Sequence, residues 1–169
     1  MRIALLSDTH GYIDDRIISY CRSCDEIWHA GDVGNADVIH TLEKTKPVRG
    51  VSGNIDGANV QSIFPKQNRF RCEDVDVLMI HIGGRPGNYF PEARKIIEKD
   101  PPKLFICGHS HILLVQYDKQ YNMLHMNPGA AGMSGFHKMR TMLRFTIEGK
   151  NIKDAEVVEL GRRGVSARD

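Results

Sequence analysis

The sequence predicts an α/β sandwich in which two β-sheets face each other. Two observations predict this fold class: β-rich and helical segments alternate at the start of the chain, and antiparallel hairpins dominate its end. A single twisted sheet is the simpler alternative, but two facing sheets account better for so many hairpins. With 169 residues, the chain has the length of one domain. We expect that domain to span residues 1–160 and residues 161–169 to form a flexible basic tail.

The first third of the chain alternates short apolar runs with segments of helical spacing. Strands are predicted at residues 2–7, 26–30 and 47–52. The first of them, RIALLS, is a continuous apolar run, as expected for a strand that is covered on both faces. Helices are predicted between these strands, at residues 14–23 and 35–45. Asn35 is a suitable N-cap for the second helix, whose apolar stripe includes Val38 and Leu42.

The remainder of the chain predicts mainly antiparallel strands. Hairpins are expected from residues 69–72 with 75–80, 112–117 with 123–126, and 142–147 with 155–160. A helix at residues 91–99 must end before Asp100-Pro101-Pro102, because the residue before a proline disfavours the helical conformation. The run KLFIC at residues 103–107 predicts a further strand.

Composition and charge exclude several classes of protein. Hydrophobic residues make up 41% of the chain and charged residues 26%, which is the composition of a globular domain. The net charge of +2 gives little attraction to nucleic acid. The sequence contains no apolar run of the ~20 residues that a membrane span needs, and its start lacks the features of a secretory signal. We therefore expect a cytoplasmic protein without membrane contact, and the sequence leaves a homo-oligomer open.

Two cysteines form a CxxC pattern near the end of the first predicted helix. Cys21 and Cys24 could be a redox pair or half of a zinc site. A zinc site needs four ligands, and the chain has no second CxxC or paired CxxH to complete it. We therefore expect these two side chains to pack in the core.

Side chains that can bind metal ions follow every long predicted strand. They are Asp8 and His10, Asp32, Asn54, His81, and His109 with His111. The carboxyl ends of strands are where open α/β sheets bind ligands. In an extended segment, residues two apart point the same way, so the DxH and HxH spacings can each direct two side chains to one place. A lone histidine at a strand end is usually a packed or exposed residue, but this coincidence at five strand ends predicts a metal centre.

The number and kind of ligands predict two ions. Seven side chains are too many for a single zinc ion, and they suit two divalent ions that share one carboxylate. Oxygen and nitrogen donors without thiolate favour Mn, Fe, Zn, Co or Ni over calcium. Paired ions about 3.5–4 Å apart stabilise both the attacking and the leaving oxygen of an in-line displacement at phosphorus. The reaction class that fits is phosphoester hydrolysis.

The order of these motifs resembles the calcineurin-like metallophosphoesterase superfamily. The matching motifs are Asp8-x-His10, Gly31-Asp32, Gly53-Asn54, His81 and Gly108-His109-x-His111, and Asn127-Pro128-Gly129 is typical of the small, YfcE-type phosphodiesterase branch. The resemblance covers residues 1–147 and implies a four-layer α/β/β/α sandwich of two mixed sheets flanked by helices. By this resemblance Asp8, His10 and His111 hold the first metal ion. Asn54, His81 and His109 hold the second, and Asp32 bridges the two. The implied activity is hydrolysis of small phosphodiesters by a hydroxide that the two ions share.

Two positions depart from the family pattern. Many members of the superfamily carry a histidine directly after the metal-binding asparagine, where this chain has Ile55. An isoleucine donates no proton, so esters with poor leaving groups are doubtful substrates. Relatives usually place glycine after the histidine at His81, where this chain has Ile82.

Further residues are expected near the reaction. Asp56 is a candidate catalytic residue together with Asp32 and Asn54, because it could orient a ligating histidine; it could also simply close an Asp-Gly turn. Four residues in loops are candidate contacts to the substrate phosphate, namely Arg85, His137, Lys138 and Arg140.

Two other functions are possible for the same motifs. A eukaryotic relative, a retromer subunit, uses this fold mainly to bind partner proteins, so a protein-interaction scaffold is the alternative to an enzyme. A nuclease is the third reading, but nuclease members of the superfamily are usually longer, and this chain has no basic stripe. The presence of all seven metal ligands favours the enzyme.

Overall fold

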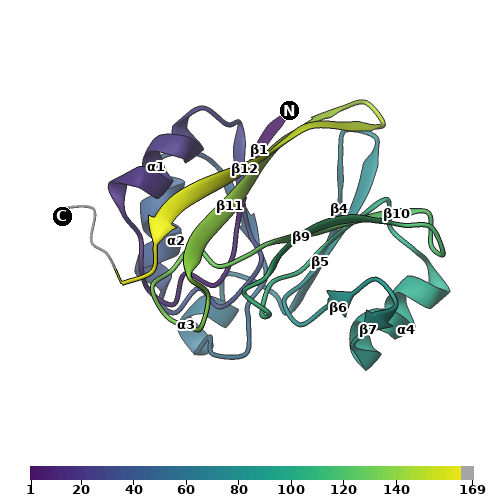
Figure 1. Cartoon of the computed structure of the whole chain (residues 1–169), viewed down its shortest axis with the longest axis horizontal. Helices are drawn as coiled ribbons and strands as arrows, with labels where there is room; N and C mark the ends of the chain where they lie inside the picture. Colours follow the sequence, from purple (N-terminus) through teal and green to yellow (C-terminus); the bar gives the residue numbers. More distant parts are fainter. Residues whose placement is uncertain (165–169) are drawn as a thin grey trace.

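The computed structural model of the protein describes residues 1–164, in which two five-stranded mixed sheets lie face to face (Figure 1). The first sheet has the order β12 (Asn151–Arg162), β11 (Met139–Glu148), β1 (Arg2–Leu6), β2 (Glu26–His29) and β3 (Val48–Gly50). The second has the order β4 (Gln67–Cys72), β5 (Val75–Ile80), β8 (Leu104–Ile106), β10 (Met123–Pro128) and β9 (Leu113–Asp118). In the first sheet only β11 runs opposite to the other four strands, and in the second sheet β4 and β9 run opposite to the three parallel strands β5, β8 and β10.

Helices cover the outer faces of both sheets. They are α1 (Asp15–Arg22), α2 (Ala36–Glu43), α3 (Ala58–Gln61) and α4 (Pro91–Lys99). Helices α1, α2 and α3 lie against the first sheet, and α4 lies against the second (Figure 1). A small hairpin of β6 (Gly84–Arg85) and β7 (Asn88–Tyr89) precedes α4. The predicted four-layer α/β/β/α sandwich is confirmed.

Three apolar clusters separate the four layers. One packs α1 to α3 against the first sheet, the second fills the space between the sheets, and the third packs α4 against the second sheet. Trp28 of β2 is fully buried in the middle cluster. Its ring packs edge-on against Phe70 of β4 at 5.0 Å and Phe145 of β11 at 5.7 Å. Burying one such side chain stabilises the fold by about 1.5–3 kcal/mol, so Trp28 is a main contact between the sheets.

The local sequence explains where the helices begin. The side chain of Asp14 accepts a hydrogen bond from the Ile17 N–H at the start of α1, and Asn35 caps α2 in the same way. Pro91 occupies the first turn of α4, where its missing N–H costs nothing.

Several boundaries differ from the expected ones. Helix α3 and the β6–β7 hairpin were not predicted, because four residues and two pairs of residues are too short to show a period. Strand β12 continues to Arg162, two residues into the predicted tail. Its pairing with β11 shifts register between Arg140 and Thr141 and then resumes at Gly161, whose positive φ of 99° accommodates the irregularity. Residues 165–169 of that tail lie outside the described residues.

The packing role expected for the two cysteines is confirmed. Cys21 and Cys24 are buried in the cluster beneath α1. Burial raises the pKa of the Cys21 thiol to about 12, so it is protonated at neutral pH.

No helix within residues 1–164 has both the length and the apolar character needed to cross a membrane.

Candidate metal centre

The seven predicted ligands follow strands of both sheets at the same edge of the sandwich. Asp8 and His10 follow β1, Asp32 follows β2 and Asn54 follows β3, whereas His81 follows β5 and the two remaining histidines follow β8. Backbone hydrogen bonds join these loops: the Asp8 N–H donates to Gly31 at 2.9 Å and the His10 N–H to Asp32 at 3.0 Å. The loops are therefore held against one another before any ligand is considered.

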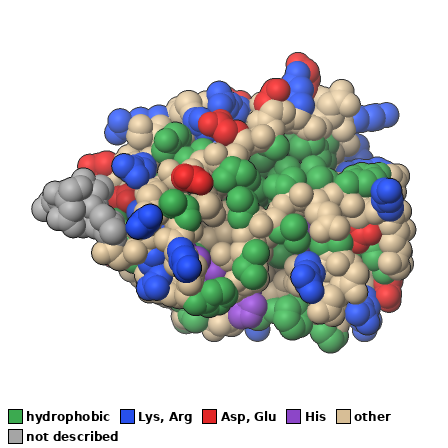
Figure 2. All heavy atoms as spheres, in the orientation of Figure 1, with side chains coloured by type: hydrophobic (Ala, Val, Ile, Leu, Met, Phe, Trp, Pro, Cys, Tyr) green, Lys and Arg blue, Asp and Glu red, His purple; other side chains and the backbone are tan. Residues whose placement is uncertain are grey.

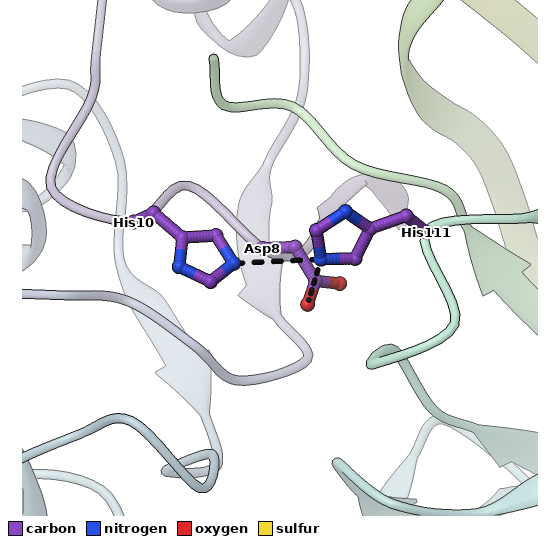
Figure 3. Close-up of side chains that lie close together, drawn as sticks. All are labelled: Asp8, His10 and His111. Carbon is purple, nitrogen blue, oxygen red and sulfur yellow. Dashed lines mark hydrogen bonds and ion pairs between the residues drawn. The ribbon is translucent and has the colours of Figure 1, made fainter. Parts of the chain in front are cut away.

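Six of the seven side chains form two groups that could each hold a metal ion. Asp8, His10 and His111 form the first group, and Asp32, His81 and His109 form the second. In each group the possible ligand atoms lie within 4.8 Å of one another. Figure 3 shows the first group, in which both imidazole rings and the carboxylate point toward one place. His10 Nε2 and His111 Nε2 are 3.4 Å apart, and His111 Nε2 lies 3.2 Å from Asp8 Oδ1.

Asp32 lies between the two groups. Its Oδ1 is 3.1 Å from His81 Nε2 in the second group, and its Oδ2 is 3.7 Å from His10 Nε2 in the first. Burial disfavours the charged carboxylate, but the neighbouring His81 ring and the Ile55 N–H, which donates to Oδ1 at 3.2 Å, hold the pKa of Asp32 below its ordinary value. Asp32 is therefore ionised, and each of its oxygens faces a different group.

The backbone at these ligands is unusual. Asp8, His10, Asp32, His109 and His111 all have positive φ values, between 48° and 67°. Residues other than glycine rarely adopt this conformation, and it is concentrated at functional sites. We expected an extended backbone to direct residues two apart to one place. The backbone at these residues is left-handed, so that explanation is wrong. Asp8 and His10 do share a group, but the two histidines after β8 belong to different groups.

Glycines allow the loops to approach the ligands closely. A Cβ atom at Gly53 would lie 2.1 Å from Asp32 Oδ1, and one at Gly31 would lie 2.5 Å from His81 Nδ1. Only glycine fits at these two positions without moving a ligand.

The hydrogen bonds of His81 direct its free nitrogen toward the carboxylates. Its Nδ1 lies 2.7 Å from the carbonyl oxygen of Ala30, so Nδ1 carries the proton and Nε2 faces Asp32 and Asp8. Burial disfavours the charged ring, but the two carboxylates outweigh burial and raise the pKa of His81. They favour a positive charge at Nε2, which either a proton or a metal ion supplies.

Unpaired polar atoms also fit a bound cation. Among residues 1–164, Asp8 Oδ1 and His81 Nε2 are buried and take part in no hydrogen bond. Buried polar atoms normally have partners, and these two lie 3.9 Å apart, so one cation beside them would satisfy both. Carboxylate and imidazole donors without thiolate suit divalent transition metals.

His137, which was a candidate contact to the substrate phosphate, points inward and orients the ring of His111. Its Nε2 lies 3.1 Å from the Gly132 carbonyl oxygen and its Nδ1 lies 3.2 Å from His111 Nδ1. Because the carbonyl can only accept, His137 donates from Nε2, and its Nδ1 accepts the proton of His111 Nδ1. The His111 Nε2 lone pair is thereby directed toward Asp8, as in other metal sites where a hydrogen bond fixes the ring of a ligating histidine.

His29 is a buried neutral residue beneath the site. The Gly31 N–H donates to its Nδ1 at 3.2 Å, and its Nε2 lies 2.9 Å from the Thr9 hydroxyl. Burial lowers the pKa of His29 to about 4.

Asp56 holds two loops together. Its carboxylate accepts hydrogen bonds from the N–H groups of Val33 at 3.1 Å, Gly34 at 2.7 Å and Gly53 at 2.7 Å. Both oxygens are thus occupied by backbone donors. These hydrogen bonds link the loop of Asp32 to the loop of Asn54, which gives Asp56 a positioning role.

The three other candidate contacts to the substrate phosphate lie in different environments. Arg140 is 2% exposed and binds the Ala131 carbonyl and Asp14, so it supports the fold instead of contacting substrate. Lys138 is exposed and lines neither of the hollows described next. Arg85 is exposed and lines a pocket beside His109.

Two hollows flank the second group. The larger, of about 330 Å³, is lined by Gly84, Arg85, Asn88, Phe90, Gly108, His109, Ser110, Ile112, Leu114, His125 and Asn127. The smaller, of about 200 Å³, is lined by Ser52, Gly53, Asn54, Lys66, Ile80, His81, Ile82 and Glu92. Asn54 therefore lies beside His81, and Ile82 contributes to the wall.

Sequence reasoning missed Phe90 and Lys66 as residues near the centre. The sequence offered one weak signal for Phe90, which is a large apolar residue directly before the proline that opens α4. Only the structure shows that its side chain is 48% exposed. Lys66 lies just before β4 and is one of many surface cations, so nothing in the sequence distinguishes it.

Comparisons with known proteins agree with this architecture. A sequence model described as the calcineurin-like phosphoesterase superfamily domain matches residues 1–150. A curated relative from Methanothermobacter thermautotrophicus, described as a probable metallophosphoesterase, is 27% identical over 166 residues and covers 95% of this chain and 94% of its own. The solved phosphoesterase YfcE from E. coli superposes with a TM-score of 0.61 at 18% identity, over 92% of this chain and 98% of its own. Vps29 from Entamoeba histolytica, solved with Zn²⁺, gives a TM-score of 0.73 at 15% identity, over 94% and 99%.

Proposed function

This chain belongs to the calcineurin-like phosphoesterase superfamily, and from that membership we propose that it hydrolyses small phosphodiesters at two divalent metal ions. The first ion is held by Asp8, His10 and His111. The second is held by His81, His109 and Asn54, and Asp32 binds both. Mn, Fe, Zn, Co and Ni all fit this donor set.

The position of Asp32 carries the proposal. Its two carboxylate oxygens face two separate groups of ligands, at 3.1 Å from His81 Nε2 and 3.7 Å from His10 Nε2. A site for a single ion would not need a carboxylate whose two oxygens face two separate groups of ligands. This arrangement supports a dinuclear centre.

The remaining chemistry follows from what each side chain does. When bound, two divalent ions supply a hydroxide nucleophile at neutral pH and neutralise the phosphoryl oxygens as charge develops. His137 and the Ala30 carbonyl fix the protonated nitrogens of His111 and His81, so that the opposite nitrogens are available as ligands. Asp8, Asp32 and His81 are buried, so these three ligands are held in place before the reaction.

The absence of an acid beside Asn54 restricts the substrates. Ile55 is 46% exposed at the surface of the site, and only its backbone N–H contacts the Asp32 carboxylate. General acid catalysis is typically worth about 10²–10⁴-fold in rate. We therefore expect diesters with good leaving groups, such as aryl esters, to be hydrolysed much faster than dialkyl esters.

A protein-interaction scaffold is the alternative, because the fold alone would serve that role. A scaffold does not require metal ligands, and here the two groups are complete and supported by His137 and Asp56. This completeness supports the enzyme.

Hydrolysis of bis-p-nitrophenyl phosphate tests the proposal. The purified chain should hydrolyse it in the presence of divalent metal and lose this activity when a chelator is added. Asp32→Asn should lower kcat/KM by about 100-fold or more, the scale of losing a group that stabilises transition-state charge. Metal analysis should find two ions per wild-type chain and fewer in the variant.

Asp37→Asn is the matched control, because Asp37 is an exposed aspartate in the first turn of α2. It should retain wild-type activity and metal content. Full activity of Asp32→Asn, or activity that persists without metal, would refute the proposal.

A further inference from the structure

We infer that the larger hollow, which we name the His109 pocket, binds a flat apolar substituent of the substrate, such as an aryl ester group. The inference rests on the proposed function and names the class of diester that this chain prefers. Three features support it: the apolar lining of the pocket, the position of His109 in both the pocket and the metal centre, and the hydrogen bonds that the polar residues of one wall already make.

The His109 pocket has the size and lining of a site for a small organic group. Its volume of about 330 Å³ lies at the lower end of the range for ligand pockets. Its apolar side chains are Phe90, Ile112 and Leu114. Phe90 is 48% exposed and Ile112 is 59% exposed, although large apolar side chains are normally buried. Exposed hydrophobic side chains gathered around one hollow indicate a binding surface.

The pocket opens directly beside the second group of ligands. His109 belongs to that group and also lines the pocket. Its ring lies edge-on to the ring of Phe90, with 6.5 Å between the centroids. On the face drawn in Figure 2, histidine side chains reach the surface next to hydrophobic ones. A phosphoryl group bound at His109 would therefore carry one ester substituent toward Phe90.

Asn127 and Ser110, two polar residues of one wall, already hydrogen-bond within the protein. The Asn127 amide donates to the Gly108 carbonyl at 2.9 Å and to Ser110 Oγ at 3.1 Å, and its oxygen accepts from the Gly129 N–H. Ser110 Oγ also accepts from the Ile112 N–H at 3.2 Å. This wall, next to Ile112 and Leu114, therefore favours an apolar group, whereas the exposed Arg85 and Asn88 are available for the phosphoryl oxygens.

The lining is held in place by the fold. The Phe90 N–H donates to the Gly83 carbonyl at 3.1 Å, and the Phe90 carbonyl accepts from Arg94 in the first turn of α4. Leu114 lies in β9, which pairs along its whole length with β10. Binding thus costs little ordering of the walls, which favours affinity.

A pair of phosphonates isolates the contribution of the pocket. Phenylphosphonate and methylphosphonate carry the same head group for the metal ions, and only the phenyl group can fill the pocket. Their dissociation constants are measured by calorimetry on the metal-loaded protein. The wild type should bind phenylphosphonate more tightly. Phe90→Ala should reduce this preference about fivefold, as expected for loss of one aromatic contact, and leave methylphosphonate binding unchanged.

Tyr117→Ala is the matched control, since Tyr117 is a similarly exposed aromatic residue that lies in β9 but does not line the pocket. It should keep the full preference for phenylphosphonate. Ile112→Ser provides a second variant of an apolar lining residue and should also reduce the preference.

The outcomes separate this inference from the proposed function. If the wild type hydrolyses bis-p-nitrophenyl phosphate but shows no preference for phenylphosphonate, or if Phe90→Ala and Ile112→Ser both keep the preference, the pocket inference is wrong. An equal loss in Tyr117→Ala also overturns it. If phosphonate binding shows a preference that depends on Phe90 while no phosphoester is hydrolysed, the pocket stands and the proposed function fails.

Discussion

At the scale of single residues, the direction of two ligand rings follows from the hydrogen bond at the ring's other nitrogen. His81 is fixed by a backbone carbonyl, whereas His111 is fixed by the side chain of His137. A side chain is easier to change than a carbonyl, so the role of ring orientation can be measured at His111.

His137→Ala should weaken metal binding to the first group by about 10–100-fold, the usual effect of losing a residue that orients a ligand. His137→Gln should restore part of the affinity, because glutamine offers one acceptor and one donor. Titration of the metal-free protein with Mn²⁺ measures this. His40→Ala, at an exposed position in α2, should have no effect. If kcat falls at saturating metal while the metal affinity is unchanged, His137 contacts the substrate and does not position His111.

Sequence patterns predicted the candidate ligands but not the residues that support them. His137 and Arg140 were predicted to contact phosphate because they are cationic or polar residues in a loop. Both side chains turn inward, where His137 meets Gly132 and Arg140 meets Ala131. A sequence shows that a residue lies in a loop, but the partner that turns it inward is distant in the chain and emerges only on folding.

At the scale of elements, the metal centre is built from loops at the carboxyl ends of strands. The positions of the strand ends were predictable, because each apolar run stops at a polar residue. The left-handed backbone at five ligands was not, since its hydrogen bonds, such as the Asp8 N–H to Gly31, join loops that are far apart in the sequence. The short α3 and the β6–β7 hairpin, which carries Arg85 to the His109 pocket, likewise lacked a periodic signal.

The Asp56 link between two of these loops leads to a prediction. Asp56→Ala leaves three backbone N–H groups without their acceptor, each worth about 1–3 kcal/mol when buried. Only the Val33 bond is fully buried, and water can partly replace the other two, so we expect the free energy of unfolding to fall by about 2–4 kcal/mol. Activity should also be lost, because the loops of Asp32 and Asn54 separate. Chemical denaturation and bis-p-nitrophenyl phosphate hydrolysis measure the two effects. Asp37→Ala serves as the control. Loss of activity with full stability would show that Asp56 acts in catalysis, as its position after Asn54 first suggested.

At the scale of the whole molecule, each ligand group joins the two sheets. The first group combines Asp8 and His10, after β1 of the first sheet, with His111, after β8 of the second. The second group combines Asp32 from the first sheet with two histidines from the second. The number of predicted hairpins favoured two sheets, but the pairing of strands that places these loops at one edge requires contacts between distant segments.

Because both groups cross from one sheet to the other, metal binding should stabilise the entire sandwich. A ligand that binds only the folded state stabilises it by about 2.7 kcal/mol at one hundred times its Kd. For a chain of this size, each kcal/mol shifts the unfolding temperature by about 2–4 °C. We therefore expect saturating Mn²⁺ to raise the unfolding temperature by about 5–10 °C relative to protein in chelator, as measured by differential scanning calorimetry. In Asp32→Asn the shift should be much smaller, because the ligand that faces both groups has lost its charge. Equal unfolding temperatures with and without metal in the wild type would show that the two groups do not bind ions strongly enough to couple the sheets.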